Sequence, residues 1–152
     1  MSYQEKRSIT NMISSVLITG IYTYIQYQRY LNGAIDDSNI FKFWAVIILV
    51  FIPITVISKI VIMIIFHIIN AVVQTAKGEE IEEEVSDERD KLIEMKASRN
   101  SMFVFAIGFI IALITQLYDV SPHVFFITMI VFGFITDIVS ELLTIKYYRR
   151  GV

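Results

Sequence analysis

Residues 43–73 read FWAVIILVFIPITVISKIVIMIIFHIINAVV, an apolar run interrupted by two ionisable side chains, Lys59 and His67. A helix needs about 20 mostly apolar residues to cross the hydrocarbon core of a bilayer, which is about 30 Å thick. As a helix, the run would measure about 46 Å at 1.5 Å per residue. The run therefore predicts an overlong membrane helix that tilts strongly, bends at Pro53, or extends from the bilayer toward a partner.

Three further segments have the length of a membrane span. Residues 101–118 and 123–145 are mostly apolar. Residues 9–31 are more polar, and two interpretations of them stay open: a spanning helix, or an amphipathic helix on the membrane surface. We favour the spanning interpretation because it makes the charge pattern consistent. Three tyrosines near the end of this segment would then form an interfacial aromatic belt.

Most lysine and arginine residues lie on one side of these predicted spans. They precede the first span, occupy the 77–100 connection and follow the fourth span, whereas only Arg29 and Lys42 flank the first connection and the 119–122 connection has none. Cytoplasmic loops carry an excess of basic residues, so the pattern predicts a multi-pass protein of the plasma membrane with both termini in the cytoplasm. The expected fold is all-α, a single transmembrane domain over residues 1–152. It would be an integral membrane four-helix bundle of two parallel-oriented helical hairpins.

Composition excludes several classes of function. The hydrophobic share is 55%, above that of a soluble domain, and the net charge of −2 offers no basic face for nucleic acid. Cysteine is absent, which excludes disulfides, cysteine nucleophiles and thiolate metal sites. No phosphate-binding loop, GxSxG or HExxH motif is present. We therefore expect no enzymatic activity, cofactor or metal.

Four ionisable side chains lie inside the predicted spans, where a charge costs roughly 2.5–3.5 kcal/mol on insertion scales. They are Lys59, His67, Asp137 and Glu141. Counted at 1.5 Å per residue from the outer helix ends, Lys59, Asp137 and Glu141 lie at depths of about 25, 21 and 27 Å, in the inner leaflet. We predict an ion pair between Lys59 and Asp137 or Glu141. Two alternatives stay open: Lys59 snorkels to the interface, or the cluster lines a transport path.

The connection at 77–100 contains two different segments. Its acidic run, residues 79–84, is typical of a solvated, mobile segment. The following segment, SDERDKLIEMKASRN at residues 86–100, predicts a short helix at the inner membrane surface that leads into the third span, with Ser86 as its N-cap. Four side chains would form its apolar side: Leu92, Ile93, Met95 and Ala97.

Residues 86–100 resemble a loop of small prokaryotic four-span membrane proteins that are catalogued as a family of unknown function. These proteins have an acidic Asp-Glu-Arg segment just before an inner-surface apolar stretch and a following span. The resemblance implies no activity. It implies an interaction loop formed by Asp87, Glu88, Arg89, Ile93 and Ala97.

The expected function is that of a non-enzymatic membrane protein acting by protein–protein contacts, as an accessory, regulatory or immunity-like subunit. It would contact the lipid bilayer and form a homo-oligomer or bind a partner membrane protein, because the long apolar helix would otherwise leave an uncovered surface. The alternative is a small oligomeric transporter or channel. Its path would be lined by the inner-leaflet cluster of Lys59, Asp137 and Glu141.

Overall fold

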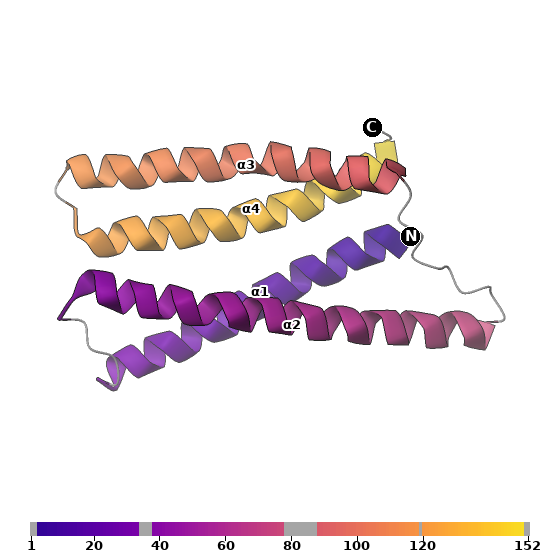
Figure 1. The fold of residues 1–152 in the computed structure, drawn as a ribbon, viewed down its shortest axis with the longest axis horizontal. Coiled ribbons are helices and arrows are strands. Elements are labelled where there is room, and N and C mark those ends of the chain that lie inside the picture. Colours follow the sequence, from indigo (N-terminus) through magenta and orange to yellow (C-terminus); the bar gives the residue numbers. More distant parts are fainter. Residues whose placement is uncertain (1–2, 34–37, 78–87, 119, 151–152) are drawn as a thin grey trace.

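The chain folds into four long α-helices. The computed structural model describes residues 3–33, 38–77, 88–118 and 120–150. Within these ranges there is no strand, so the predicted all-α class is confirmed. The helices are α1 (Tyr3–Leu31), α2 (Ile40–Lys77), α3 (Glu88–Leu117) and α4 (Pro122–Arg150). The start of α1 and the end of α4 lie at the same end of the molecule (Figure 1).

Three of the helices are long and apolar enough to cross a membrane. They are Ile40–Ala76 within α2, and the whole of α3 and α4. Little of their most apolar stretches is covered by the chain itself; Leu49 and Phe103 keep exposed fractions of 67% and 68%. Large apolar surfaces of this kind are typical of helices that contact lipid or protein. The chain is therefore a membrane protein, and α1 has the length of a span without the same apolar content.

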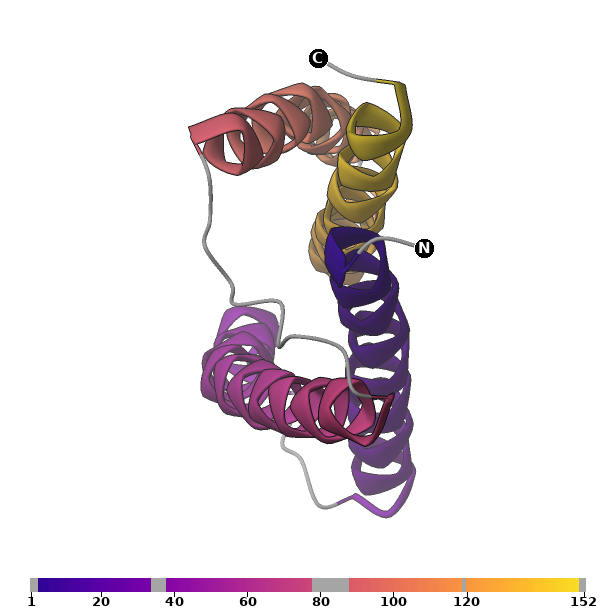
Figure 2. The same ribbon diagram turned by 90° about the vertical axis from the view of Figure 1, so that its right-hand side faces the viewer.

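The helices form an open arc (Figure 2). Helix α3 packs along α4, α4 packs on α1, and α1 packs on α2, so their spatial order is α3–α4–α1–α2. Helix α2 approaches α4 at a short crossing, and the described parts of α2 and α3 make no close backbone approach. The arrangement differs from a closed four-helix bundle, because α2 and α3 form two edges that do not meet.

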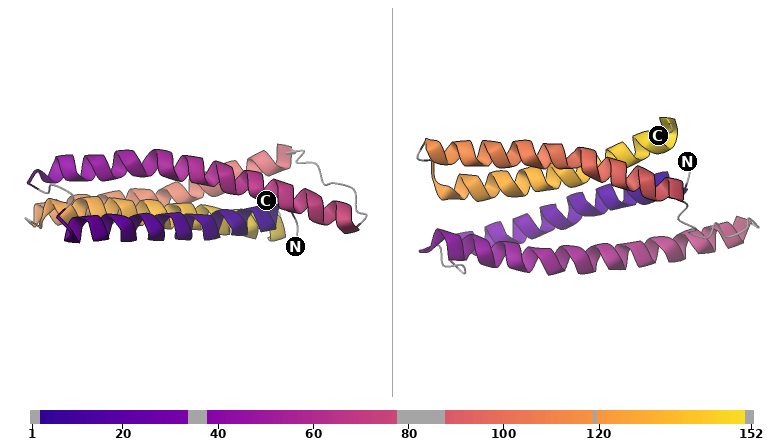
Figure 3. Two further views of the ribbon diagram at one scale, coloured as in Figure 1. Left: turned by 90° about the horizontal axis from the view of Figure 1, so that it is seen from below. Right: turned by 45° about the horizontal axis from the view of Figure 1, so that its top comes forward.

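Helix α2 is longer than the sequence predicted. It contains 38 residues and continues through Pro53, so it measures about 57 Å at 1.5 Å per residue. Its C-terminal end extends beyond the other three helices (Figure 1 and Figure 3). The surplus length of α2 therefore lies at its C-terminal end (Figure 1).

Helix α3 corrects the prediction for residues 86–100. It begins at Glu88 and continues to Leu117, so residues 88–100 and the third predicted span are one helix. The expected short helix is instead the first part of α3, because no Gly or Pro lies between residues 88 and 107 to end the helix. The expected N-cap Ser86 and the acidic run at 79–84 lie outside the described residues.

Small side chains on α3 allow its close packing against α4. Ala97, Ser101 and Ala112 have exposed fractions of 0, 2 and 0%, and Gly108 is also buried. A Cβ atom at Gly108 would overlap the side chain of Phe132 on α4. Small residues bring membrane helices together in this way because they let the backbones approach.

Candidate functional site

An ion pair joins α2 to α4 within the apolar stretch of both helices. The Lys59 ammonium donates to the two carboxylate oxygens of Asp137, at Nζ–O distances of 3.1 and 3.0 Å. The hydroxyl of Ser15 on α1 donates to the same carboxylate, with 2.5 Å between the oxygens. The Lys59 and Asp137 side chains keep 30% and 39% of their surface exposed. Three helices thus converge on one carboxylate that the single chain only partly covers.

Glu141 lies one turn further along α4 and has different partners. The amide of Asn11 donates to Glu141 Oε1 at an N–O distance of 3.0 Å, and Ser8 also forms a hydrogen bond with this carboxylate. Of the two partners that the sequence left open for Lys59, the structure therefore places Asp137 in contact. It places Glu141 against α1.

The first half of α1 presents a polar face to α3 and α4. Gln4, Ser8, Asn11 and Ser15 are three or four residues apart and therefore lie on one side of the helix. Their polar partners include carboxylates at Asp90, Glu141 and Asp137. We call the following set the polar column: Gln4, Ser8, Asn11, Ser15, Lys59, Asp90, Asp137 and Glu141.

A polar cavity of about 270 Å³ lies beside the column, between α1, α3 and α4. Its size admits several water molecules, each of which takes about 30 Å³ in the liquid. Arg7 and Glu94 form an ion pair at its wall, with an N–O distance of 3.4 Å. The cavity is lined by Gln4, Arg7, Ser8, Asn11, Glu94, Ser98, Ser140, Glu141 and Thr144.

Polar contacts also tie together the helix ends at which α1 starts and α4 finishes. Asp90 on α3 accepts hydrogen bonds from the Gln4 amide at 3.2 Å and from the Tyr148 hydroxyl at 2.9 Å. Glu5, with an exposed fraction of 8%, pairs with Arg149 at an N–O distance of 2.7 Å. These contacts connect three helices at the end of the column.

The structure does not assemble the five residues of the expected interaction loop into one surface. Ile93 and Ala97 are fully buried, so they pack inside the chain and are unavailable to a partner. Glu88 and Arg89 are exposed at the start of α3. Asp87 lies outside the described residues.

The apolar side expected on residues 86–100 is likewise divided. Ile93 and Ala97 face the chain interior, whereas Leu92 and Met95 keep exposed fractions of 57% and 65%. Because helical residues one or two positions apart point to different sides, one apolar surface was too simple an expectation.

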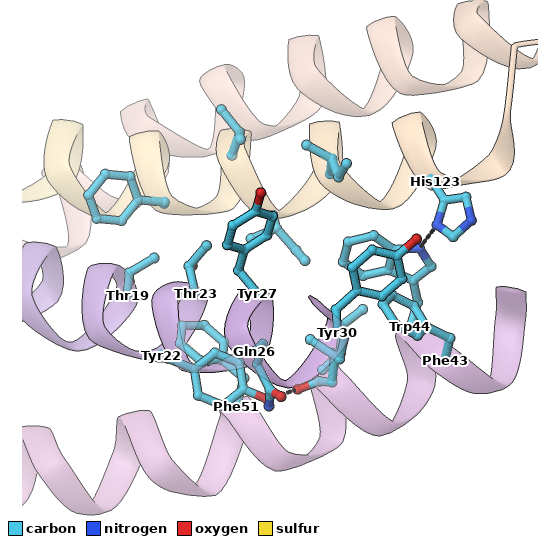
Figure 4. A pocket seen from close by; sticks show the side chains of 16 residues that line it. Thr19, Tyr22, Thr23, Gln26, Tyr27, Tyr30, Phe43, Trp44, Phe51 and His123 are labelled. Carbon is cyan, nitrogen blue, oxygen red and sulfur yellow. Dashed lines mark hydrogen bonds between the residues drawn. The ribbon is translucent and has the colours of Figure 1, made fainter. Parts of the chain in front are cut away.

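An apolar pocket of about 540 Å³ lies between α1, α2 and α4, beyond the ion pair along the spans (Figure 4). Tyr22 donates its hydroxyl hydrogen to the carbonyl oxygen of Ile47 at 2.6 Å, which joins α1 to α2. At the far end of the pocket, the Trp44 indole donates to His123 Nδ1 at 3.0 Å. The pocket walls are mostly aliphatic and aromatic.

His67 lies away from the ion pair. Its Nδ1 is 2.6 Å from the Tyr3 hydroxyl oxygen, so it belongs to a contact between the start of α1 and the second half of α2. In the ranges that the structure describes, no group of three His, Cys, Asp or Glu side chains could hold a metal ion.

Sequence reasoning missed the contribution of α1. Asn11 and Ser15, which hold the two intramembrane carboxylates, were treated only as polar interruptions of a weak span. The signal was available, because Gln4, Ser8, Asn11 and Ser15 repeat with the helical period.

The fold and the site define an α-helical membrane protein with an ion pair inside its apolar helices. Comparisons with protein-family models, with curated proteins and with solved structures find no match. Function is therefore inferred from the polar column and the apolar pocket.

Proposed function

We propose that this chain is a non-enzymatic, multi-pass membrane protein that acts through protein contacts within the bilayer. Its role would be that of an accessory, regulatory or immunity-like subunit of a prokaryotic plasma membrane. The observation that carries the proposal is the Lys59–Asp137 ion pair. It lies within apolar helices, yet 30% and 39% of the two side chains remain exposed on the single chain.

The physical argument is the cost of charge in lipid. Charged side chains in membrane helices almost always face other protein or water, because contact with hydrocarbon is unfavourable. One chain covers the Lys59–Asp137 pair incompletely, since α2 and α3 leave the arc open. A second copy or another membrane protein seated at this opening would remove the pair from lipid.

The extended part of α2 supports the same proposal. Five large apolar side chains in its second half have exposed fractions of 49–63%: Ile64, Ile65, Ile68, Ile69 and Val72. The C-terminal end of this half extends beyond the other helices (Figure 1), whereas His67 still contacts Tyr3 at the start of α1. An apolar surface outside the bilayer needs a protein partner to exclude water.

The proposed topology has four spans, with α1 as the first and both termini in the cytoplasm. Helix α1 is amphipathic. Its polar face contacts α4, and the side chains on the opposite face are apolar and exposed, as expected for a helix between protein and lipid. Ile13, Leu17 and Ile21 have exposed fractions of 53, 56 and 58%. An N-in, C-in orientation also places the basic clusters in the cytoplasm.

Association in lipid nanodiscs tests the main proposal. We expect the wild type to form particles with more than one copy, or to retain a membrane partner through mild purification. The double variant Lys59→Met with Asp137→Leu removes both charges and should shift the population toward single copies. The matched control is Lys42→Met, which removes an exposed lysine. Single copies without a partner in the wild type, or unchanged association in the double variant, would contradict the proposal.

A second candidate function, ion or proton passage, is favoured by the polar cavity next to Glu141. An intramembrane carboxylate beside a cavity large enough for water is the arrangement that proton paths use. In proteoliposomes under a proton gradient, this candidate predicts a flux that Glu141→Gln or Asp137→Asn abolishes. The control variant Glu88→Gln changes an exposed carboxylate outside the column and should leave the flux intact. Absence of flux in folded wild-type protein would reject the candidate.

A further inference from the structure

The apolar pocket has the size and composition of a ligand site. Its volume of about 540 Å³ falls within the range of about 300–1,000 Å³ that is usual for small-molecule pockets. Phe43, Trp44 and Phe51 line it from α2, and Ile130 and Phe134 line it from α4. α1 supplies the remaining wall, which carries most of the polar groups (Figure 4).

A short hydrogen-bond relay fixes the orientation of one polar group in the wall. The Tyr22 hydroxyl has a single hydrogen, and it donates that hydrogen to the Ile47 carbonyl oxygen at 2.6 Å. The Gln26 side chain must therefore present its NH₂ group, and Nε2 donates to the Tyr22 hydroxyl oxygen at 2.6 Å. The amide oxygen of Gln26 is left without a role in this relay.

That amide oxygen is a buried acceptor in need of a donor. Within the residues that the structure describes, Gln26 Oε1 is the one buried side-chain nitrogen or oxygen without a hydrogen-bond partner. Buried polar atoms are nearly always hydrogen-bonded, since an unmatched acceptor loses its hydration without replacement. Gln26 is also one of the residues that line the apolar pocket.

We propose that the pocket binds a membrane-soluble amphiphile with an apolar body and one hydroxyl group. The body would contact the aromatic and aliphatic walls, and the hydroxyl would donate its hydrogen to Gln26 Oε1, which is buried and would turn toward the pocket to accept it. A water-soluble polar ligand fits poorly, because its other polar groups would meet apolar side chains. The pocket also lies within the helices that form the membrane-spanning part of the chain. This proposal is independent of the function proposed above.

Photolabelling of the full chain in phosphatidylcholine nanodiscs tests the proposal. The probes are a diazirine-bearing long-chain alcohol and the matched alkane that lacks the hydroxyl. We expect the label to concentrate on the pocket walls of α1, α2 and α4. The alcohol should occupy the site about tenfold more than the alkane, which corresponds to about 1.4 kcal/mol.

Three variants separate the contributions. Ile130→Trp fills the pocket and should abolish the concentrated label, whereas the control Leu49→Trp adds the same ring at an exposed position outside the pocket. Gln26→Leu removes the acceptor and should equalise the alcohol and the alkane. Helix content by circular dichroism identifies any variant that does not fold. Label spread evenly along the helices would overturn the pocket as a site. Equal labelling by both probes in the wild type would overturn the role of Gln26 and indicate that water satisfies it.

Discussion

One face of α1 lines two regions with opposite chemistry. In its first half, Asn11 and Ser15 hold carboxylates of α4 beside a polar cavity. In its second half, Tyr22 and Gln26 line an apolar pocket that aromatic side chains of α2 help to enclose. Both regions lie between α1 and α4. They differ in the chemistry of the space between the helices, which is a polar cavity in the first region and an apolar pocket in the second.

Under the proposed four-span topology, the difference explains why α1 has a lower mean hydropathy than the other three helices. Its polar side chains face α4 and α2, and its apolar side chains, including Val16 and Ile25 with exposed fractions of 50% and 48%, face outward. A membrane helix can have this inverted pattern because lipid solvates the outer side while protein satisfies the inner side. Average hydropathy therefore understates a helix whose polar face packs against other helices.

The largest expected effect comes from breaking the ion pair in the polar column. Asp137→Ala leaves the Lys59 ammonium without its counter-charge among apolar helices and should lower the free energy of unfolding by about 3 kcal/mol. Adding Lys59→Ala should recover part of the loss, because the second substitution removes the stranded charge. Unfolding in mixed micelles measures both. Strictly additive losses would show that the two side chains are not coupled.

A smaller effect is expected from the packing of α3 on α4. Helix α3 lines the polar cavity and does not line the apolar pocket. Gly108→Val inserts atoms against Phe132 and should cost about 2 kcal/mol of stability by overpacking. The matched control is Gly133→Ala, where a Cβ meets nothing within 4 Å. Chemical unfolding of the two variants compares them. A loss at Gly133→Ala as large as at Gly108→Val would contradict the packing of α3 on α4.

Within the apolar pocket, the expected effect is that of losing two hydrogen bonds. Tyr22→Phe keeps the ring against Phe51, whose centroid is 4.9 Å away, and removes the bond to the Ile47 carbonyl and the bond from Gln26 Nε2. The stability should fall by about 1–2 kcal/mol. Tyr24→Phe is the control, because Tyr24 has an exposed fraction of 64%. The measurement is thermal unfolding in detergent. Equal stability of the Tyr22→Phe and Tyr24→Phe variants would contradict the role assigned to the Tyr22 hydroxyl.

The smallest effect is expected at the end of the polar column. Arg149→Ala removes the partner of Glu5, but 61% of the Arg149 side chain is exposed. Only 10% of the Glu5 side chain is exposed, so the pair is half buried. Exposed ion pairs contribute about 0–1 kcal/mol, and salt screens them. We expect a change at the upper end of this range that high salt reduces. A large, salt-independent loss would mean that the helix ends are held together more strongly than the exposure indicates.

Much of the fold follows from hydrophobic patterning, and the site follows only in part. The all-α class, the long α2 and the depth match of Lys59 with Asp137 are readable from length and periodicity. The open arc is not, because the order in which helices pack depends on their side-chain shapes, such as the fit of Gly108 to Phe132. The continuity of residues 88–100 with the rest of α3 was not predicted, although the charged residues in this segment are good helix formers.

The roles of the polar residues on α1 were also hidden in the sequence. The roles of Asn11 and Ser15 depend on their hydrogen bonds to Glu141 and Asp137, which lie on α4 at the other end of the chain. Periodicity shows that the α1 residues share a face, but a single sequence does not show which helix that face meets. Gln26 was missed for the same reason, since its unmatched oxygen is a property of the packed pocket.

The contrast between the two regions can be measured directly because the chain contains no cysteine. Single Ser140→Cys and Ile130→Cys variants place the one thiol in the polar cavity or in the apolar pocket. A charged, water-soluble thiol reagent is then added to nanodiscs, and the rate of modification is followed. The account predicts fast modification of the Ser140→Cys variant and little modification of the Ile130→Cys variant. Equal rates, or faster modification of the Ile130→Cys variant, would contradict it.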